Sequence, residues 1–189
     1  AGGAVYSPAL TDFVIMAEGS LMFLTVPDVI KAVTGEQVTA QTLGGADVHT
    51  GRSGVAHLSA DTEANTLALT KLLLSYLPQN NHEAAPQIRP EDPAHRMYDA
   101  LNSLIPDDEN QPYDMRDAIT AIFDTDSFLE IQAAFAANAV VGFARLDGYS
   151  VGVVANQPAY MSGVLNIDAS DKIARFIRTC DAYNLPIVT

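Results

Sequence analysis

The sequence predicts an α/β fold in which strands and helices follow one another along the whole chain. Short runs rich in β-branched and aromatic residues alternate with segments whose apolar side chains recur at the helical spacing of three and four residues. The chain is 48% hydrophobic and 17% charged, which supplies enough apolar surface for a core and excludes a disordered chain. One proline-rich segment, residues 78–93, separates two such mixed regions.

The first region begins with a glycine turn and a short helix. Gly2 and Gly3 make the turn, and we expect the helix over residues 4–11. Two β-rich runs follow at residues 13–17 and 21–25, and each is short enough to be a strand.

The rest of the first region is predicted as two helices separated by a loop and a strand. Residues 27–34 have proline in the first helical turn and are followed by a glycine. Residues 39–54 contain four glycines and are expected to be loop, and residues 55–58 are expected to form a strand. Asp61 is the expected N-cap of a longer helix that ends near residue 76. The apolar face of this helix is Leu69, Leu72, Leu73, Tyr76 and Leu77.

A linker is predicted between the two regions because residues 78–93 contain four prolines, two asparagines and few apolar side chains. We therefore divide the chain into residues 1–80, a linker at 81–94, and residues 95–189.

The second region contains the clearest hairpin of the chain. A helix capped by Asp114 comes first, with a regular apolar face. Strands at 139–146 and 149–155 are joined by Asp147 and Gly148, a dipeptide typical of two-residue hairpin loops. Asp168 is expected to open the final helix, and the apolar residues 185–189 are expected to begin a buried strand.

Charge excludes several classes of protein. The net charge of −13 comes from 23 acidic and 10 basic residues, which argues against a nucleic-acid-binding or polybasic membrane-surface protein.

A single cysteine excludes an internal disulfide and a cysteine-built zinc cluster. The chain has no apolar run of roughly 18 residues and no signal-peptide pattern. We expect a soluble cytoplasmic protein, located in the mitochondrial matrix in a eukaryote. Because the chain opens without Met and closes on an apolar run, we expect an internal piece of a longer polypeptide.

The side chains offer little catalytic chemistry. His49, His57, His82 and His95 share no metal-ligand spacing, so we expect no metal to be bound by this chain. Cys180 lies on the apolar face of the predicted last helix and is expected to be a buried, inert thiol. Nucleophile elbows, Walker loops and dinucleotide-binding fingerprints are absent from the sequence.

One backbone pattern could stabilise an anion. Gly2, Gly3 and Ala4 precede a helix, where N–H groups lack helical partners and lie at the positive end of the dipole. Glycine also lets another molecule approach the backbone closely. The segment is either an oxyanion hole, suited to the enolate of a thioester, or a plain turn.

An ordered series of motifs covers essentially the whole chain. It resembles the carboxyltransferase β subunits of biotin-dependent acyl-CoA carboxylases, of the propionyl-CoA carboxylase and transcarboxylase type. The matching segments are AGGAVYSPALTDF at 1–13, MFLTVPDVIK at 22–31, SGVAH at 53–57, LSYLPQNN at 74–81, GVVANQP at 152–158 and ASDKIARF at 169–176.

The resemblance implies parts of two tandem crotonase-like domains, each a ββα superhelix of the ClpP/crotonase type. Residues 1–80 would be the back half of the N-terminal carboxyltransferase domain, and residues 95–189 the front part of the C-terminal one. Backbone N–H groups of Gly2, Gly3 and Ala4 would hold the acyl-CoA enolate. The oxyanion hole for biotin would lie beyond Thr189, so this fragment alone is expected to be inactive.

The resemblance also implies cofactors and partners. Biotin would arrive on a carrier protein, and a coenzyme A thioester would be the substrate. Partners would be a biotin carboxylase or biotin carboxyl carrier subunit and further copies of the chain, in a hexamer. Propionyl-CoA is the favoured acyl group.

Two other interpretations stay open: the carboxyltransferase part of a biotin-dependent decarboxylase, and a catalytically silent assembly piece. Lys31, Arg52 and Lys71 are the only basic residues before the linker that could contact coenzyme A phosphates.

Overall fold

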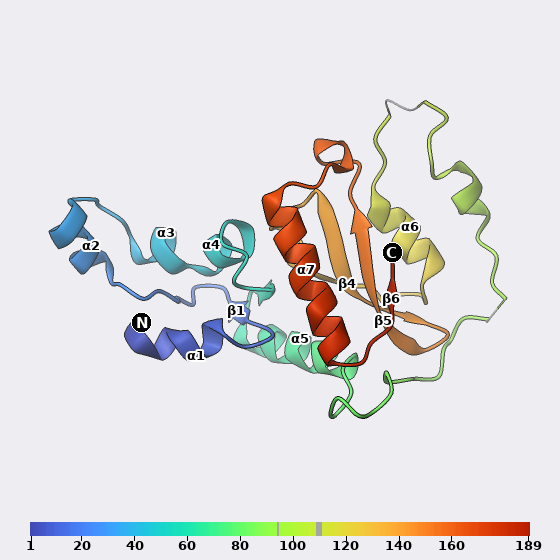
Figure 1. The fold of residues 1–189 in the computed structure, drawn as a ribbon, viewed down its shortest axis with the longest axis horizontal. Helices are drawn as coiled ribbons and strands as arrows, with labels where there is room; N and C mark the ends of the chain where they lie inside the picture. The colour runs from blue at the N-terminus through green and yellow to red at the C-terminus, as the bar shows by residue number, and fades with distance from the viewer. Residues whose placement is uncertain (94, 109–110) are drawn as a thin grey trace. The chain divides into compact units, whose positions relative to one another are not determined.

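The structure is a computed structural model that describes residues 1–93, 95–108 and 111–189 (Figure 1). Contacts group the chain into two compact units. The first contains Ala1–Lys71 together with Gln132–Phe135, and the second contains Leu72–Ile131 and Ala136–Thr189. Both units combine helices with strands, as the sequence predicts.

The first unit contains a short parallel pair of strands, β1 (Ile15–Ala17) and β2 (Leu58–Ala60), with Ile15 opposite Leu58. Its core side chains are Val14, Met16, Met22, Ala46 and Ala56. The helical elements of the unit are the 3₁₀ turn η1 (Gly2–Val5), α1 (Tyr6–Ala9), α2 (Pro27–Thr34), α3 (Ala40–Gly44) and α4 (Ala46–Gly51).

Helix α2 forms where the sequence predicts it. Pro27 occupies the first turn, where its missing N–H has no helical acceptor to lose. Gly35 ends the helix in the left-handed conformation, with φ of 77°, and donates its N–H to Lys31 O at 3.0 Å.

Three predictions for this unit were wrong in detail. Residues 21–25 form only an isolated bridge, Leu21 to Gly45, because carbonyls of this segment accept bonds from η1 and α4 instead of a strand. Residues 39–54 are helical, since Thr39 and Thr42 form a capping box that starts α3. The strand expected at 55–58 is shifted to Leu58–Ala60.

Gln132–Phe135 completes the first unit from a distant part of the chain. Gln132 N–H donates to His57 O at 2.8 Å, and its side-chain amide donates to Gly54 O. The Phe135 ring lies over Gly54, where a Cβ would approach the ring to 2.7 Å. Glycine is therefore required at position 54, which also has a φ of +65°.

Helix α5 (Glu63–Ser75) continues from the first unit into the second. Thr62 rather than Asp61 caps it, because Thr62 Oγ1 accepts the N–H of Asn65 at 3.1 Å. Asp61 instead accepts a bond from the Asn65 side chain at 2.6 Å.

The second unit contains a four-stranded sheet in the order β3–β4–β5–β6. The strands β3 to β5 pair antiparallel, whereas β6 is parallel to β5. Helix α7 packs along β4 and β5 (Figure 1). The elements are β3 (Leu129–Ile131), β4 (Ala139–Leu146), β5 (Tyr149–Asn156), β6 (Ile187–Val188), α6 (Met115–Ile122), α7 (Ile167–Ala182), and the 3₁₀ turns η2 (Asp99–Ser103) and η3 (Met161–Gly163).

The predicted hairpin is confirmed. Leu146 faces Tyr149 across a two-residue loop in which Asp147 and Gly148 have φ of 50° and 78°. The Asp124 carboxylate accepts the N–H groups of both loop residues, at 3.0 and 2.7 Å. The cap of α6 by Asp114 is also confirmed, while α7 begins one residue earlier than predicted and is capped by Asn166.

Residues 81–93 run beside this hairpin. Ser150 N–H donates to Pro86 O at 2.8 Å, and Ile88 N–H donates to Gly148 O at 3.0 Å. By its contacts this stretch belongs to the second unit. Its role as a linker between carboxyltransferase domains at 1–80 and 95–189 stays a prediction, and Ala94 lies outside the described residues.

One core cluster of the second unit joins α6 to the sheet through Ile119, Phe123, Val140, Ala144, Val151 and Val153. The buried Phe143 ring also contacts the rings of Tyr76 and Phe176, at centroid distances of 5.9 and 5.1 Å. The Arg145 guanidinium lies 4.6 Å from the Tyr76 ring and donates to Ser75 O at 2.9 Å. Beside them, Gly152 leaves room for the buried Cys180 of α7. Close packing of α7 on the sheet therefore depends on glycine at position 152.

We expect Gly152→Ala to lower the free energy of unfolding by about 1–3 kcal/mol, because overpacking a core strains it. The new Cβ would lie 2.6 Å from Cys180 Sγ and 3.3 Å from the Phe176 ring. Denaturant unfolding of the full-length protein measures the change. Adding Cys180→Ala should recover part of the loss. Gly51→Ala is the control, because a Cβ there meets nothing within 4 Å. Equal stability of Gly152→Ala and the wild type would contradict this packing.

Candidate functional site

The glycine turn at the start of the chain lies against residues 23 and 24. Gly2 has a φ of +73°, and its N–H is shared between Phe23 O at 3.2 Å and Leu24 O at 3.0 Å. A side chain at position 2 would strain this left-handed backbone. Gly2 therefore fixes where η1 begins.

The next two residues of η1, Gly3 and Ala4, are exposed. Among the described residues, no backbone acceptor outside η1 is bonded to the N–H of either residue. A Cβ built on Gly3 would meet nothing within 4 Å, so the surface there is open. Of the three residues that the sequence predicts as donors, Gly2 has its N–H bonded to Phe23 and Leu24, whereas the N–H groups of Gly3 and Ala4 have no acceptor outside η1.

An apolar cavity of about 360 Å³ lies beside this turn in the first unit. Side chains from η1, α1, α2, α3, α4 and the segment after β1 line it. The lining residues are Val5, Ala9, Met22, Phe23, Leu24, Thr25, Ile30, Leu43, His49 and Val55.

The four histidines have separate environments. His49 is partly buried, and its Nε2 bonds to Met22 O while its Nδ1 lies 2.9 Å from Ser53 Oγ. His57 is only 5% exposed and accepts the N–H of Val14 on Nδ1 at 3.0 Å. His82 and His95 are exposed. In the stretches 1–93, 95–108 and 111–189, no three His, Cys, Asp or Glu side chains are placed to hold a metal ion.

Cys180 is a buried thiol, as the sequence predicts. Burial raises its pKa to about 12, because the thiolate would lose its hydration. The thiol therefore stays protonated near neutral pH and is not a nucleophile. The basic residues Lys31, Arg52 and Lys71 of the first unit are all exposed and open to contact with an anionic molecule.

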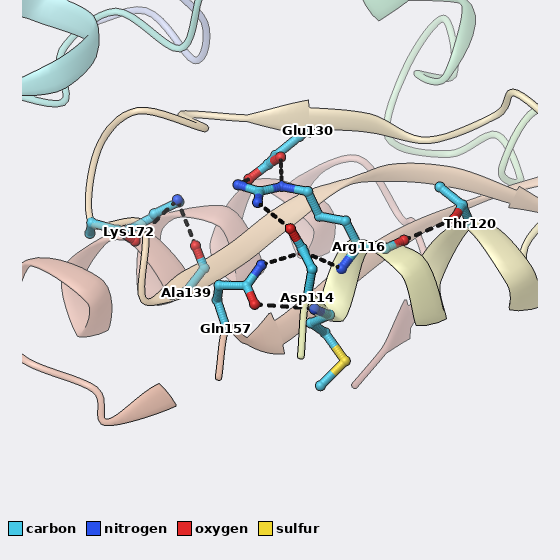
Figure 2. A network of polar contacts seen from close by, with 9 residues as sticks. Asp114, Arg116, Thr120, Glu130, Ala139, Gln157 and Lys172 are labelled. Carbon is cyan, nitrogen blue, oxygen red and sulfur yellow. Dashed lines mark hydrogen bonds and ion pairs between the residues drawn. The ribbon is translucent and has the colours of Figure 1, made fainter. Parts of the chain in front are cut away.

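A polar network that sequence reasoning missed joins α6, β3 and the end of β5 (Figure 2). Asp114 accepts the N–H of Arg116 at 2.9 Å and the side-chain amide of Gln157 at 2.6 Å. Arg116 also pairs with Glu130 through Nε at 2.7 Å. The hydrogen bonds to Glu130 and the negative charge of that carboxylate raise the pKa of Arg116, so its guanidinium stays cationic. Gln157 is fully buried and accepts the N–H of Met115 at 3.1 Å.

Lys172 of α7 lies at the edge of this network (Figure 2) and is 2% exposed. Its Nζ donates to Ala139 O at 2.7 Å. Burial lowers the Lys172 pKa to about 8, and the nearby charge of Glu130 opposes that shift. The network ties the helices of the second unit to its sheet, which is a structural role.

No helix in the described part of the chain is both long and apolar enough to cross a membrane.

Comparison with known proteins gives consistent matches over the whole chain. The family model described as the carboxyl transferase domain matches residues 1–189. The carboxyltransferase subunit of a propionyl-CoA carboxylase from Haloferax mediterranei is 55% identical over 190 residues. The α subunit of a methylmalonyl-CoA decarboxylase from Veillonella parvula is 54% identical over 189 residues. Each alignment covers 100% of this chain and 37% of the relative, so the chain spans little more than a third of their length.

Solved structures agree with the sequence matches. Transcarboxylase 12S, a hexamer solved with hydrolysed methylmalonyl-coenzyme A bound, has a TM-score of 0.95 and 49% identity. The match covers 98% of this chain and 37% of that one. A single-chain, multi-domain long-chain acyl-CoA carboxylase has a TM-score of 0.81 at 24% identity, which speaks for the fold alone. The predicted α/β, crotonase-like fold class is confirmed by these neighbours.

We expect the stability of the second unit to rise with pH through the titration of Lys172. Its pKa is lowered to about 8 in the folded chain from 10.5, so between these values the unfolded chain binds a proton that the folded one has lost. The cost of burying the charged ammonium is present in full below pH 8 and disappears as the pH rises towards 10.5. The free energy of unfolding of the wild type, relative to Lys172→Met, should therefore rise by about 3 kcal/mol across this window.

Denaturant unfolding of the full-length protein at pH 7 to 10.5 measures this difference. Lys71→Met, which removes an exposed lysine, is the matched control and should follow the wild type. A constant difference between the wild type and Lys172→Met over the whole range would show that Lys172 does not titrate in this window.

Proposed function

The chain belongs to the carboxyl transferase domain family, and we propose that its full-length protein transfers a carboxyl group from carboxybiotin to the α-carbon of a short acyl-CoA. Propionyl-CoA is the acyl group we favour. The observation that carries the proposal is the 55% identity, over the whole chain, to a propionyl-CoA carboxylase subunit.

The N–H groups of Gly3 and Ala4 supply the chemistry of this chain in the proposal. They would donate to the thioester oxygen as it becomes an enolate oxygen during removal of the α-proton. Fixed backbone donors of this kind stabilise a developing anion without reorganising, and one donor is worth about 10²–10³ in kcat. Gly2 would position the pair, because its own N–H is held by the carbonyls of Phe23 and Leu24.

Biotin supplies the carboxyl group when it is bound, and its contacts are proposed to come from outside this chain. Residues 95–189 contain no second Gly-Gly-Ala that could donate to the ureido oxygen. We therefore place the biotin-side residues beyond Thr189. A biotin carboxylase or carrier subunit would deliver the group, and the chain would assemble as a hexamer in the cytoplasm or the mitochondrial matrix. The hexameric assembly of transcarboxylase 12S, which is 49% identical to this chain, supports this proposal.

A decarboxylase is the second candidate, favoured by the 54% identity to the methylmalonyl-CoA decarboxylase α subunit of Veillonella parvula. Both reactions would use the same enolate site. They differ in the direction of transfer, because a carboxylase would move the carboxyl group from biotin to the acyl-CoA and a decarboxylase from the acyl-CoA to biotin. The partners of the full-length protein separate the two.

The first test is carboxyl transfer by the full-length protein from methylmalonyl-CoA or malonyl-CoA to free biotin. We expect transfer with both donors and faster transfer from methylmalonyl-CoA. Faster transfer from malonyl-CoA would indicate that acetyl-CoA, rather than propionyl-CoA, is the preferred acceptor. No transfer by a folded, oligomeric protein would contradict the proposal and favour a silent assembly piece.

Gly3→Val should separate an oxyanion site from a plain turn. We expect kcat to fall by about 100-fold or more, because the branched side chain obstructs the approach of the thioester to the N–H donors. The melting temperature should stay within about 2 °C of the wild type, since a Cβ at position 3 meets nothing within 4 Å.

Gly51→Val is the matched control for this experiment. Gly51 lies in the same unit, and a Cβ there also meets nothing within 4 Å. This control should turn over at the wild-type rate. Wild-type kcat in Gly3→Val would assign the glycines to a structural turn.

A further inference from the structure

His49 connects three parts of the first unit that are separate in sequence. It lies in α4 (Ala46–Gly51), and its ring bonds to Met22 O on one side and to Ser53 Oγ on the other. Its own carbonyl accepts the N–H of Ala56 at 3.0 Å. None of the proposed chemistry uses this side chain, although it lines the apolar cavity beside η1.

The partners of the ring determine which nitrogen carries the proton. A carbonyl oxygen can only accept, so Nε2 must carry the hydrogen that bonds to Met22 O. In the neutral ring Nδ1 is then an acceptor, and the Ser53 hydroxyl donates to it at 2.9 Å. Met22 O therefore selects this tautomer, and the Ser53 hydroxyl, which can donate or accept, bonds to the remaining ring nitrogen.

Met22 directly precedes the two residues whose carbonyls hold Gly2. Met22 N–H donates to Gly44 O at 2.8 Å, and Met22 O accepts from His49, so both backbone polar groups of Met22 are bonded. The next two carbonyls, of Phe23 and Leu24, accept the N–H of Gly2. Hydrogen bonds therefore join Ser53 to His49 and His49 to Met22, and the backbone of residues 22–24 connects them to the bond that holds Gly2 of η1.

We infer that His49 is a positioning residue for the proposed enolate site, acting through residues 22–24 and Gly2 on the N–H groups of Gly3 and Ala4. The inference rests on the proposed function. Small displacements of preorganised donors reduce transition-state stabilisation more than substrate binding. Loss of the His49 hydrogen bond should therefore lower kcat and leave KM for the acyl-CoA nearly unchanged.

The test compares three variants of the full-length protein in carboxyl transfer from methylmalonyl-CoA to free biotin. His49→Phe keeps a ring without the donor, and we expect kcat to fall at least 10-fold with KM within threefold. His49→Gln keeps an N–H that can reach Met22 O and should retain kcat within about threefold of the wild type. Ser53→Ala removes only the hydroxyl that bonds to His49 Nδ1 and should lower kcat about threefold. His82→Phe, on an exposed histidine, is the control and should match the wild type.

Amide hydrogen exchange provides a readout that does not depend on turnover. In His49→Phe the hydrogen-bonded amides of Gly2 and Met22 should exchange at least 10-fold faster than in the wild type. Peptides of the β4–β5 hairpin should be unaffected. A general loss of stability would instead accelerate exchange throughout the first unit, including β1 and β2.

Each outcome bears on a different statement. An active wild type with wild-type kcat in His49→Phe would overturn the inference and leave the proposed function standing. An equal loss of kcat in His49→Gln and His49→Phe would show that the N–H donor at position 49 has no role, and would overturn the inference. If His49→Phe does not fold, the Ser53→Ala variant decides, and an unchanged kcat there overturns the inference. A wild type that transfers no carboxyl group would instead overturn the proposed function and this inference with it.

Discussion

The shared hydrogen bond from Gly2 N–H to the carbonyls of Phe23 and Leu24 is the contact on which the proposed site depends. It uses the N–H of Gly2, and the next two residues, Gly3 and Ala4, are exposed. The proposal places its chemistry on the backbone, because Cys180 is a buried, protonated thiol and the described residues contain no cluster of metal ligands. A site made of peptide groups cannot be adjusted by rotating a side chain, so its precision comes from whatever fixes the backbone. Here that support comes from residues 22–24 and from α4.

Local signals were enough to predict the elements whose boundaries are set by one or two residues. Pro27 and Gly35 set the ends of α2, and Asp147 with Gly148 sets the hairpin, because each residue type favours one backbone conformation. The segment 21–25 has the composition of a strand but is not one, since its acceptors are used by Gly2, about twenty residues earlier. The same reason limits the prediction of the site. The glycine turn was found from the sequence, but nothing local shows that Gly2 N–H is occupied or that His49 lies behind it.

The polar network of the second unit could not be predicted from local patterns, because its partners are far apart in the sequence. The structure pairs Glu130 with Arg116 and lets Asp114 accept from Gln157, 43 residues further along. Lys172 enters the same region from α7 and is held by a carbonyl of β4. Gln157 and Lys172, the buried members of this network, specify one arrangement of helices on the sheet, because any other arrangement would leave them without partners.

Gln132–Phe135 belongs to the first unit although both of its flanks belong to the second. The two units are therefore interleaved along the chain, and no single cut separates them. A clone ending before residue 95 would lack the donors to Gly54 O and His57 O and the ring that covers Gly54. Its first unit would expose that site to water and to other chains. During synthesis the first unit is likewise incomplete when Lys71 leaves the ribosome. It can be completed only after about sixty more residues have emerged, when Gln132–Phe135 becomes available. Tandem sequence order does not, in this chain, mean independent folding.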